Sequence, residues 1–161
     1  MNARICSYGE NNSAKGMGTT VVMLAFGKKG VYLSNVGDSK AFLHNSTGLS
    51  QISCDHVVNL SGRSKPPLSQ CLGISPDEFV IKPHLAMSEY SALNRYLICS
   101  DGLTDMVSPE EIEAIMSEKK PVQETAEALM KTALFNGGTD NITIILCELS
   151  KKNFFKRKVL K

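Results

Sequence analysis

Short runs of β-branched and apolar residues, each closed by a glycine-containing turn, constrain the fold of this chain most strongly. Residues 19–26 and 31–36 are two such runs, joined by a short link that begins and ends with glycine. Residues 40–44 and 49–53 repeat the arrangement a little further along. Runs of this length with short connections are typical of antiparallel hairpins. This part of the chain is therefore predicted to be a β-meander.

Helical signals dominate the second half. Ser108 is followed by a proline and, three residues after the serine, by Glu111, a pattern that begins a helix and predicts one as far as about Ser117. A second helix is predicted from Pro121, with apolar residues at helical spacing, to the stop at 136–138.

Three further strands complete the expected fold, over residues 79–85, 96–100 and 141–149. Pro83 places the first of them at a sheet edge. Strands, then two helices, then a closing strand make an α+β arrangement rather than regular βαβ repetition. Residues 55–77 are rich in glycine and proline and show no period, which is typical of a functional or mobile segment.

Length and hydropathy exclude several classes of protein. The 161 residues fit one domain of about 150 residues. The longest apolar run, residues 21–26, is far shorter than the roughly 18 residues of a membrane span, so no transmembrane segment is expected. Residues 1–13 lack the apolar stretch of a secretory signal. The five cysteines form no Cys-x-x-Cys pair, and we expect reduced core thiols in a cytoplasmic protein.

The charge is unevenly distributed. Six of the 18 basic residues and none of the 16 acids lie in residues 151–161, so the rest of the chain carries a formal charge of −4. An acidic body argues against a nucleic-acid partner. The basic tail is either solvated or placed against an anionic membrane surface.

Four aspartates carry the most specific chemical signal. Asp38, Asp101 and Asp140 each stand beside a glycine-containing turn at a predicted strand end, and Asp105 follows Asp101 by four residues. Carboxylates that meet at one rim of a sheet would suit a hard divalent cation such as Mg²⁺ or Mn²⁺. Each aspartate alone is also typical of an ordinary turn or helix start, and only the four together indicate a metal site.

Six short motifs follow one another along the chain. They are Gly16-Met17-Gly18-Thr19-Thr20, Val36-Gly37-Asp38-Ser39-Lys40-Ala41, Asp55-His56, Leu72-Gly73, Cys99-Ser100-Asp101-Gly102-Leu103-Thr104-Asp105 and Gly137-Gly138-Thr139-Asp140-Asn141-Ile142-Thr143. Their order is that of the metal-dependent protein phosphatases, and residues 16–149 resemble the bacterial type 2C serine/threonine phosphatases of that family.

The resemblance implies a β-sandwich of two antiparallel sheets with helices outside, and a binuclear Mg²⁺ or Mn²⁺ site at one rim. It implies that Asp101 and Asp140 are ligands of the first core metal. It also implies that Asp38 binds a more weakly held third ion, shared with Asp101 and Asp105. In this family a metal-bound water attacks the phosphorus of phosphoserine or phosphothreonine in line.

The resemblance further implies that only part of the domain is present. The family's Asp-Gly-x-Gly-Gly motif, whose aspartate bridges the core metals, lies upstream of Met-Gly-Thr-Thr and is absent here, as is the phosphate-binding arginine. Lys40 stands where the family usually has arginine. We therefore expect an unstructured or partial segment over 1–15, a partial phosphatase domain over 16–150 and a basic tail over 151–161. We also expect an unpaired sheet edge and an exposed apolar face.

Two functional hypotheses follow. The first is a protein serine/threonine phosphatase, whose activity in the chain as given is expected to be weak or absent. The second is a pseudophosphatase that binds its partner without turnover. By resemblance, the partners are phosphorylated proteins, the targets of a serine/threonine kinase.

Overall fold

Two antiparallel sheets form the frame of the molecule. The structure is a computed structural model and describes residues 1–27, 29–58, 65–89 and 91–149. In chain order the elements are α1 (Asn2–Asn11), β1 (Val21–Phe26), β2 (Val31–Val36), β3 (Lys40–Asn45), β4 (Gly48–Gln51), β5 (His84–Ser88), β6 (Arg95–Cys99), α2 (Asp101–Thr104), α3 (Pro109–Ser117), α4 (Val122–Phe135) and β7 (Ile144–Glu148). One sheet has the order β1-β2-β5 and the other β4-β3-β6-β7.

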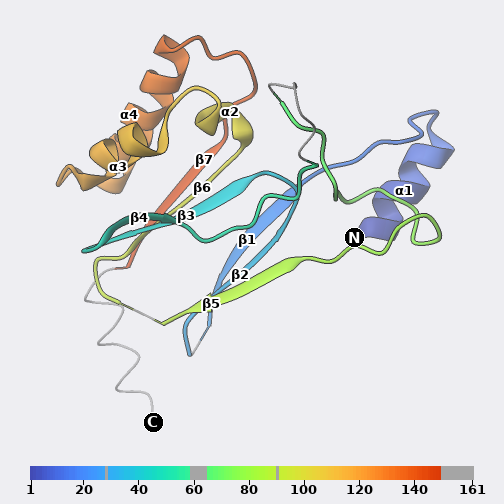
Figure 1. Cartoon of the computed structure of the whole chain (residues 1–161), viewed down its shortest axis with the longest axis horizontal. Coiled ribbons are helices and arrows are strands. Elements are labelled where there is room, and N and C mark those ends of the chain that lie inside the picture. Colours follow the sequence, from blue (N-terminus) through green and yellow to red (C-terminus); the bar gives the residue numbers. More distant parts are fainter. Residues whose placement is uncertain (28, 59–64, 90, 150–161) are drawn as a thin grey trace.

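The expected α+β sandwich with outer helices is confirmed. Figure 1 shows α3 and α4 beside the four-stranded sheet, whereas α1 stands apart from both sheets. Between the sheets, the ring of Phe26 in β1 meets the ring of Tyr96 in β6 edge-on, with centroids 5.8 Å apart. The hydroxyl groups of Ser88 and Tyr96 form a second link, 3.1 Å long.

Both predicted hairpins are present, but they do not form one meander. Strand β2 pairs with β1 and β5, whereas β3 pairs with β4 and β6. The chain changes sheets at Gly37, which has a φ of 102°. A Cβ atom there would come 2.3 Å from the Thr20 side chain, so the turn requires glycine.

The predicted strand over 79–85 is wrong in its bounds. Strand β5 begins at His84, directly after Pro83, because proline has no N–H to donate to a neighbouring strand. As predicted, it lies at a sheet edge. The strands predicted over 96–100 and 141–149 are confirmed as β6 and β7, within three residues at each end.

The two long helices begin and end where the sequence predicts. The Ser108 hydroxyl accepts from the backbone N–H of Glu111 at 3.2 Å, and the Glu111 carboxylate accepts from the N–H of Ser108 at 3.0 Å. Helix α4 starts directly after Pro121. It stops before two glycines whose φ values are positive, 127° at Gly137 and 52° at Gly138.

The N-terminal segment, expected to be unstructured or partial, contains a helix, since residues 2–11 form α1. Tertiary contacts stabilise this polar helix. The Asn2 amide donates to the carbonyl of Ile74 at 2.9 Å and accepts from the N–H of Gly73 at 2.6 Å. Periodicity within the segment could not reveal these contacts. The basic tail over 151–161 lies outside the described residues.

The main core lies between the four-stranded sheet and its helices. Its buried members are Phe42, Leu97, Cys99, Leu103, Val107, Ile112, Met116, Leu129 and Ala133. Contrary to expectation, Cys99 is the one buried cysteine of the five, all of which lie in the described chain and are free thiols. Burial raises the pKa of the Cys99 thiol to about 12. Among the described helices, none combines the length and apolar character needed to cross a bilayer.

Candidate functional site

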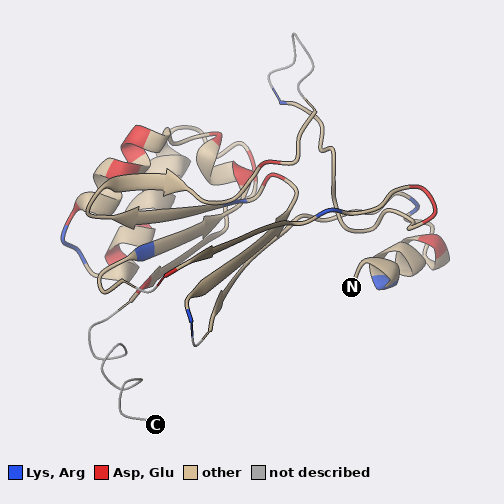
Figure 2. Cartoon of the chain, turned by 60° about the horizontal axis from the view of Figure 1, so that its bottom comes forward, with Lys and Arg blue, Asp and Glu red and all other residues tan. Residues whose placement is uncertain are grey.

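The four predicted aspartates come from three turns at one end of the sandwich. Asp38 lies in the turn between β2 and β3. Asp101 and Asp105 lie at the two ends of α2, directly after β6, and the N–H of Asp105 donates to the carbonyl of Asp101 at 2.8 Å. Asp140 precedes β7. Figure 2 shows acidic residues both on the outer helices and at this end of the sheets.

Ser100 fixes the relative position of the β6 and β7 ends. Its hydroxyl donates to the carbonyl of Asn141 at 2.9 Å and accepts from the N–H of Thr143 at 3.0 Å. Next to it, a Cβ atom at Gly102 would come 2.4 Å from the carbonyl oxygen of Asn141. Glycine therefore allows the close approach that brings Asp101 and Asp140 to the same rim.

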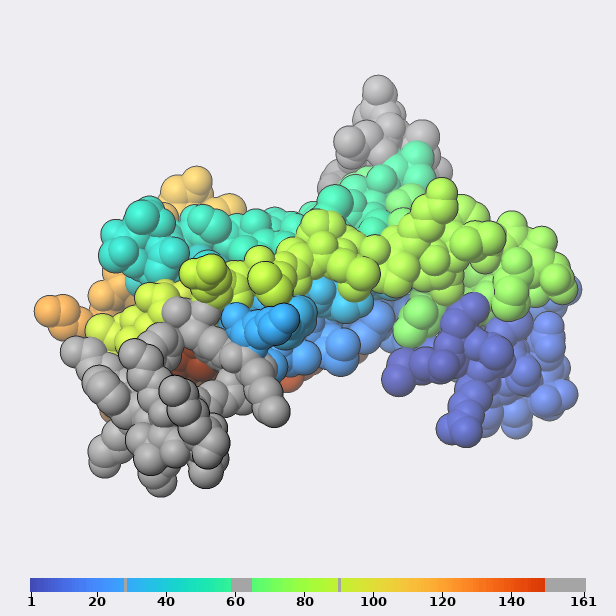
Figure 3. All heavy atoms as spheres, turned by 90° about the horizontal axis from the view of Figure 1, so that it is seen from below, coloured from blue at the N-terminus to red at the C-terminus, as the bar shows by residue number. Residues whose placement is uncertain are grey.

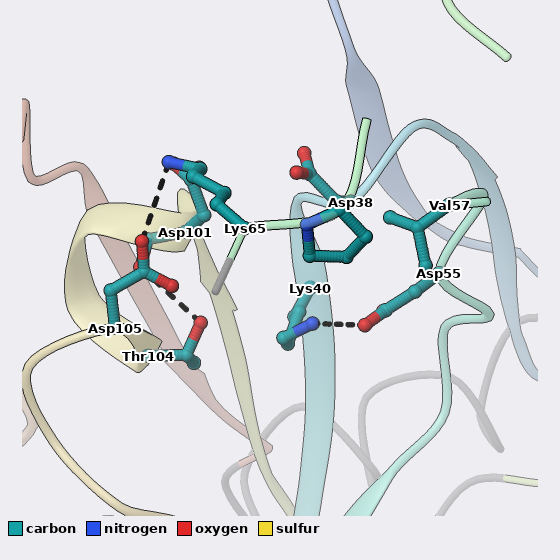
Figure 4. A pocket seen from close by; sticks show the side chains of 9 residues that line it. Asp38, Lys40, Asp55, Val57, Lys65, Asp101, Thr104 and Asp105 are labelled. Atoms are coloured by element: carbon teal, nitrogen blue, oxygen red, sulfur yellow. Dashed lines mark hydrogen bonds and ion pairs between the residues drawn. The ribbon is translucent and has the colours of Figure 1, made fainter. Parts of the chain in front are cut away.

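A pocket of about 490 Å³ opens at this rim. Asp38, Asp101 and Asp105 line it, together with Lys40, Asp55, Val57, Lys65, Pro66 and Thr104. In Figure 4 the Lys65 side chain extends over the α2 carboxylates, while Lys40 and Asp55 face each other on the opposite wall. Three of the four predicted aspartates thus share one pocket.

Lys65 links the fourth aspartate to the group. Its Nζ atom lies 2.5 Å from Oδ2 of Asp101, 3.3 Å from Oδ2 of Asp105 and 3.2 Å from Oδ2 of Asp140. The hydrogen bond to Asp101 is the main reason that the pKa of Lys65 is raised. Three carboxylates therefore hold one ammonium group.

Lys40 is neutralised separately. It pairs with Asp55, which also accepts from the Gln51 amide at 2.7 Å. The neighbouring His56 supports the Asp38 turn, because its Nδ1 atom accepts from the N–H of Gly37 at 3.1 Å. The Asp55-His56 motif thus braces the pocket wall.

The environments of Asp38 and Asp140 differ. Burial, followed by repulsion from Asp101, raises the pKa of Asp38. The pKa of Asp140 is lowered, first by the backbone N–H of Asn141, which donates to its carboxylate at 2.7 Å, and then by Lys65. A cation at this rim would favour the ionised form of both.

The donor set suits a hard cation in chemical type, since its members are carboxylate oxygens and they already surround an ammonium group. In the described part of the chain, however, no group of three or more His, Cys, Asp or Glu side chains is arranged closely enough to hold a metal ion. The aspartates converge without forming a complete coordination shell among themselves.

Lys65 is the residue that sequence reasoning missed. It lies in the irregular segment 55–77 and belongs to none of the six motifs. The only signal in the sequence is the irregular composition of this segment, typical of a functional or mobile region, which singles out no individual residue.

No protein-family model matches the chain. The chain is 32% identical over 167 residues to the serine/threonine phosphatase stp of Listeria welshimeri, an alignment that covers 92% of this chain and 64% of the relative. The chain thus spans somewhat less than two thirds of that protein.

The fold of this chain is also similar to solved structures of bacterial phosphatases. The Mycobacterium tuberculosis serine/threonine phosphatase PstP/Ppp matches with a TM-score of 0.80 and 30% identity, covering 92% of this chain and 68% of that one. The catalytic domain of PstP in complex with two manganese ions matches with a TM-score of 0.81 and 30% identity, covering 93% of this chain and 67% of that one. By sequence and by fold, this chain belongs to the bacterial serine/threonine phosphatases of the metal-dependent, type 2C family.

Proposed function

We propose that this chain carries much of the metal-binding rim of a protein serine/threonine phosphatase that hydrolyses phosphoserine and phosphothreonine. The observation that supports the proposal most strongly is the convergence of Asp101, Asp105 and Asp140 on a single positive charge beside a pocket lined by Asp38. The manganese-bound relative supports the same kind of chemistry.

In the proposed roles, Asp101 and Asp140 hold a core Mg²⁺ or Mn²⁺ ion. Asp38 and Asp105, together with Asp101, hold a third and more weakly bound ion. Divalent cations at such a rim activate a water for attack on phosphorus and neutralise charge on the phosphoryl oxygens. The residues of this chain contribute carboxylates from three turns, fixed by Ser100, Gly102 and the Gly37 turn.

The substrates we propose are phosphorylated proteins made by a serine/threonine kinase. Charged side chains make up most of the lining of the pocket, as expected for a site that takes a phosphorylated side chain presented on a polypeptide. The five free thiols favour a reducing compartment, and we propose a cytoplasmic location.

Manganese-dependent hydrolysis of a phosphothreonine peptide tests the proposal. We expect a low rate for the chain as given, and a rate at least about tenfold lower for Asp101→Asn and Asp140→Asn, because each loses an anionic ligand. Asp77→Asn is the matched control, since Asp77 is exposed and lies outside the pocket. Equal and measurable rates in the wild type and both rim variants would refute the assignment.

The second candidate is a pseudophosphatase that binds a phosphoprotein without turnover. It is favoured by the lack of a complete carboxylate shell among the described residues. Binding of the phosphopeptide with Mn²⁺ present, without release of phosphate, would select it. An in-frame Asp-Gly-x-Gly-Gly upstream of Met1 in the gene would instead favour the enzyme.

A further inference from the structure

We propose that Lys65 is a built-in counter-cation, which offsets part of the negative charge of the acidic rim and competes with divalent metal ions for its carboxylates. The inference rests on the proposed function, because it takes Asp101, Asp105 and Asp140 to be part of the metal-binding rim. It adds a competitor that belongs to the protein itself.

The geometry singles out Lys65 from other paired lysines. Its ammonium group contacts three carboxylates, which come from both ends of α2 and from the loop before β7. Among the described residues, Lys40 and Lys120 each pair with one carboxylate, Asp55 and Glu118 respectively. Three aspartates therefore share the single positive charge of Lys65.

The Lys65 ammonium group and a metal ion cannot both contact the same carboxylate oxygens. All three contacts of Lys65 are to Oδ2 atoms. A small divalent cation such as Mg²⁺ binds such an oxygen at about 2.0–2.1 Å, and a second positive charge at contact distance would repel it. Metal binding therefore requires the ammonium group to leave, and the lost ion pairs weaken the apparent metal affinity.

The side chain is well placed to leave. Lys65 is 52% exposed and its four-carbon stem is flexible, so its ammonium group can move into water with little loss of packing. Without metal, the same contacts relieve repulsion among the rim carboxylates. Lys65 thereby sets a threshold of metal concentration below which the protein's own ammonium group, and not a metal ion, occupies the rim.

Calorimetric titration with Mn²⁺ tests the competition in the full chain. We expect Lys65→Gln to bind Mn²⁺ about tenfold more tightly than the wild type, equivalent to ~1.4 kcal/mol. Lys65→Arg keeps the charge and is expected to retain weak binding. Lys120→Gln is the matched control. Lys120 is 49% exposed and pairs at 2.5 Å with one carboxylate, that of Glu118, whereas Lys65 pairs with three. Lys120→Gln should bind Mn²⁺ as the wild type does.

Thermal unfolding in excess EDTA supplies a readout that needs no metal. Lys65→Gln should melt at a lower temperature than Lys120→Gln because it leaves three carboxylates without their shared cation. Adding Mn²⁺ should then raise its melting temperature more than that of the wild type.

The outcomes separate the two proposals. If the wild type and Lys65→Gln bind Mn²⁺ equally tightly and Asp101→Asn weakens binding, the competition by Lys65 is wrong and the metal site stands. If neither the wild type nor Lys65→Gln binds Mn²⁺, the metal site is wrong, and the inference falls with it.

Discussion

The two sheets of the sandwich are built from similar strands, yet their outer faces have different surroundings. Helices α3 and α4 contact β4 and β7 of the four-stranded sheet, and α2 contacts β6. No helix in the described chain makes a comparable contact with β1, β2 or β5. In Figure 3, which views the molecule from below, much of the yellow-green strand β5 lies at the surface.

The open face of the three-stranded sheet is apolar. Met23, Leu85 and Met87 are 53%, 71% and 59% exposed. Tyr32 stands directly opposite Met87 in the β2–β5 register, and Leu85 and Met23 flank Ser34 on the same face. The expected exposed apolar face is thus confirmed.

The contrast shows that burial depends on the layer opposite a strand as well as on the strand's own residues. Leu97 on β6 is fully buried because helices cover it, whereas Leu85 on β5 has no such cover. The stability of the molecule should therefore be concentrated in the helix-covered half. Substitutions in the two halves should accordingly differ in their effect on stability.

Leu129→Ala should lower the free energy of unfolding by about 2–5 kcal/mol, because Leu129 is fully buried in the core between α4 and the sheet. Urea denaturation followed by circular dichroism measures the loss. Leu85→Ala, the matched change on the open face, should cost less than about 0.5 kcal/mol. Equal losses at the two positions would contradict the comparison.

Arg95→Met should lower the free energy of unfolding by about 2 kcal/mol. Arg95 lies on β6 and donates to the carbonyls of Met116, Glu118 and Lys120 at 3.3, 3.4 and 2.7 Å, which ties the end of α3 to the sheet. Arg95→Lys should restore little of the lost free energy of unfolding, since one ammonium group cannot reach all three carbonyl acceptors. Full stability in Arg95→Lys would show that charge alone matters.

His44 should make the covered half sensitive to acid. Burial lowers the pKa of His44, and Arg95 lowers it further while Glu113 opposes them. A lowered folded-state pKa contributes stability above the unfolded pKa of about 6.5, and this contribution is lost as the pH falls through the folded pKa.

We expect His44→Gln to flatten the decline of stability below about pH 6.5, measured by urea denaturation at several pH values. The effect should be smaller than that of Arg95→Met. His84→Gln on β5 is the control and leaves His44 in place. An unchanged decline in His44→Gln would assign the acid sensitivity to other groups.

Leu85→Lys combined with Met87→Lys should change the free energy of unfolding by less than about 0.5 kcal/mol per site, because both side chains are exposed. The same change should reduce self-association in sedimentation velocity, since it breaks an apolar surface. A large loss of stability would show that this face is buried in solution.

Much of the fold could be predicted where the signals are local. The Ser108 cap, the proline at the start of α4 and the glycine-flanked turns each act within a few residues, and the structure confirms the elements that they predict. The assignment of strands to sheets depends on contacts between distant residues. Local signals therefore predict one continuous β-meander, whereas in the structure the chain passes from one sheet to the other at Gly37.

The same division applies to the site. The motifs singled out the four aspartates because turn residues at strand ends leave a readable pattern. The structure brings Asp38, Asp101 and Asp105 to one pocket and places Asp140 beside Lys65. Lys65 could not be predicted, because a single lysine in an irregular segment belongs to no sequence motif. Its role depends on the aspartates that the fold places around it.

The hairpins and the two long helices can be read from the sequence, because hydrogen bonds and backbone preferences within short segments decide them. The four aspartates can be read from the motifs around them. Which sheet face is covered, which strands pair across the chain and where the Lys65 ammonium group lies become visible only in the folded molecule. These features depend on the summed packing and electrostatics of segments far apart in the chain, which no local pattern records.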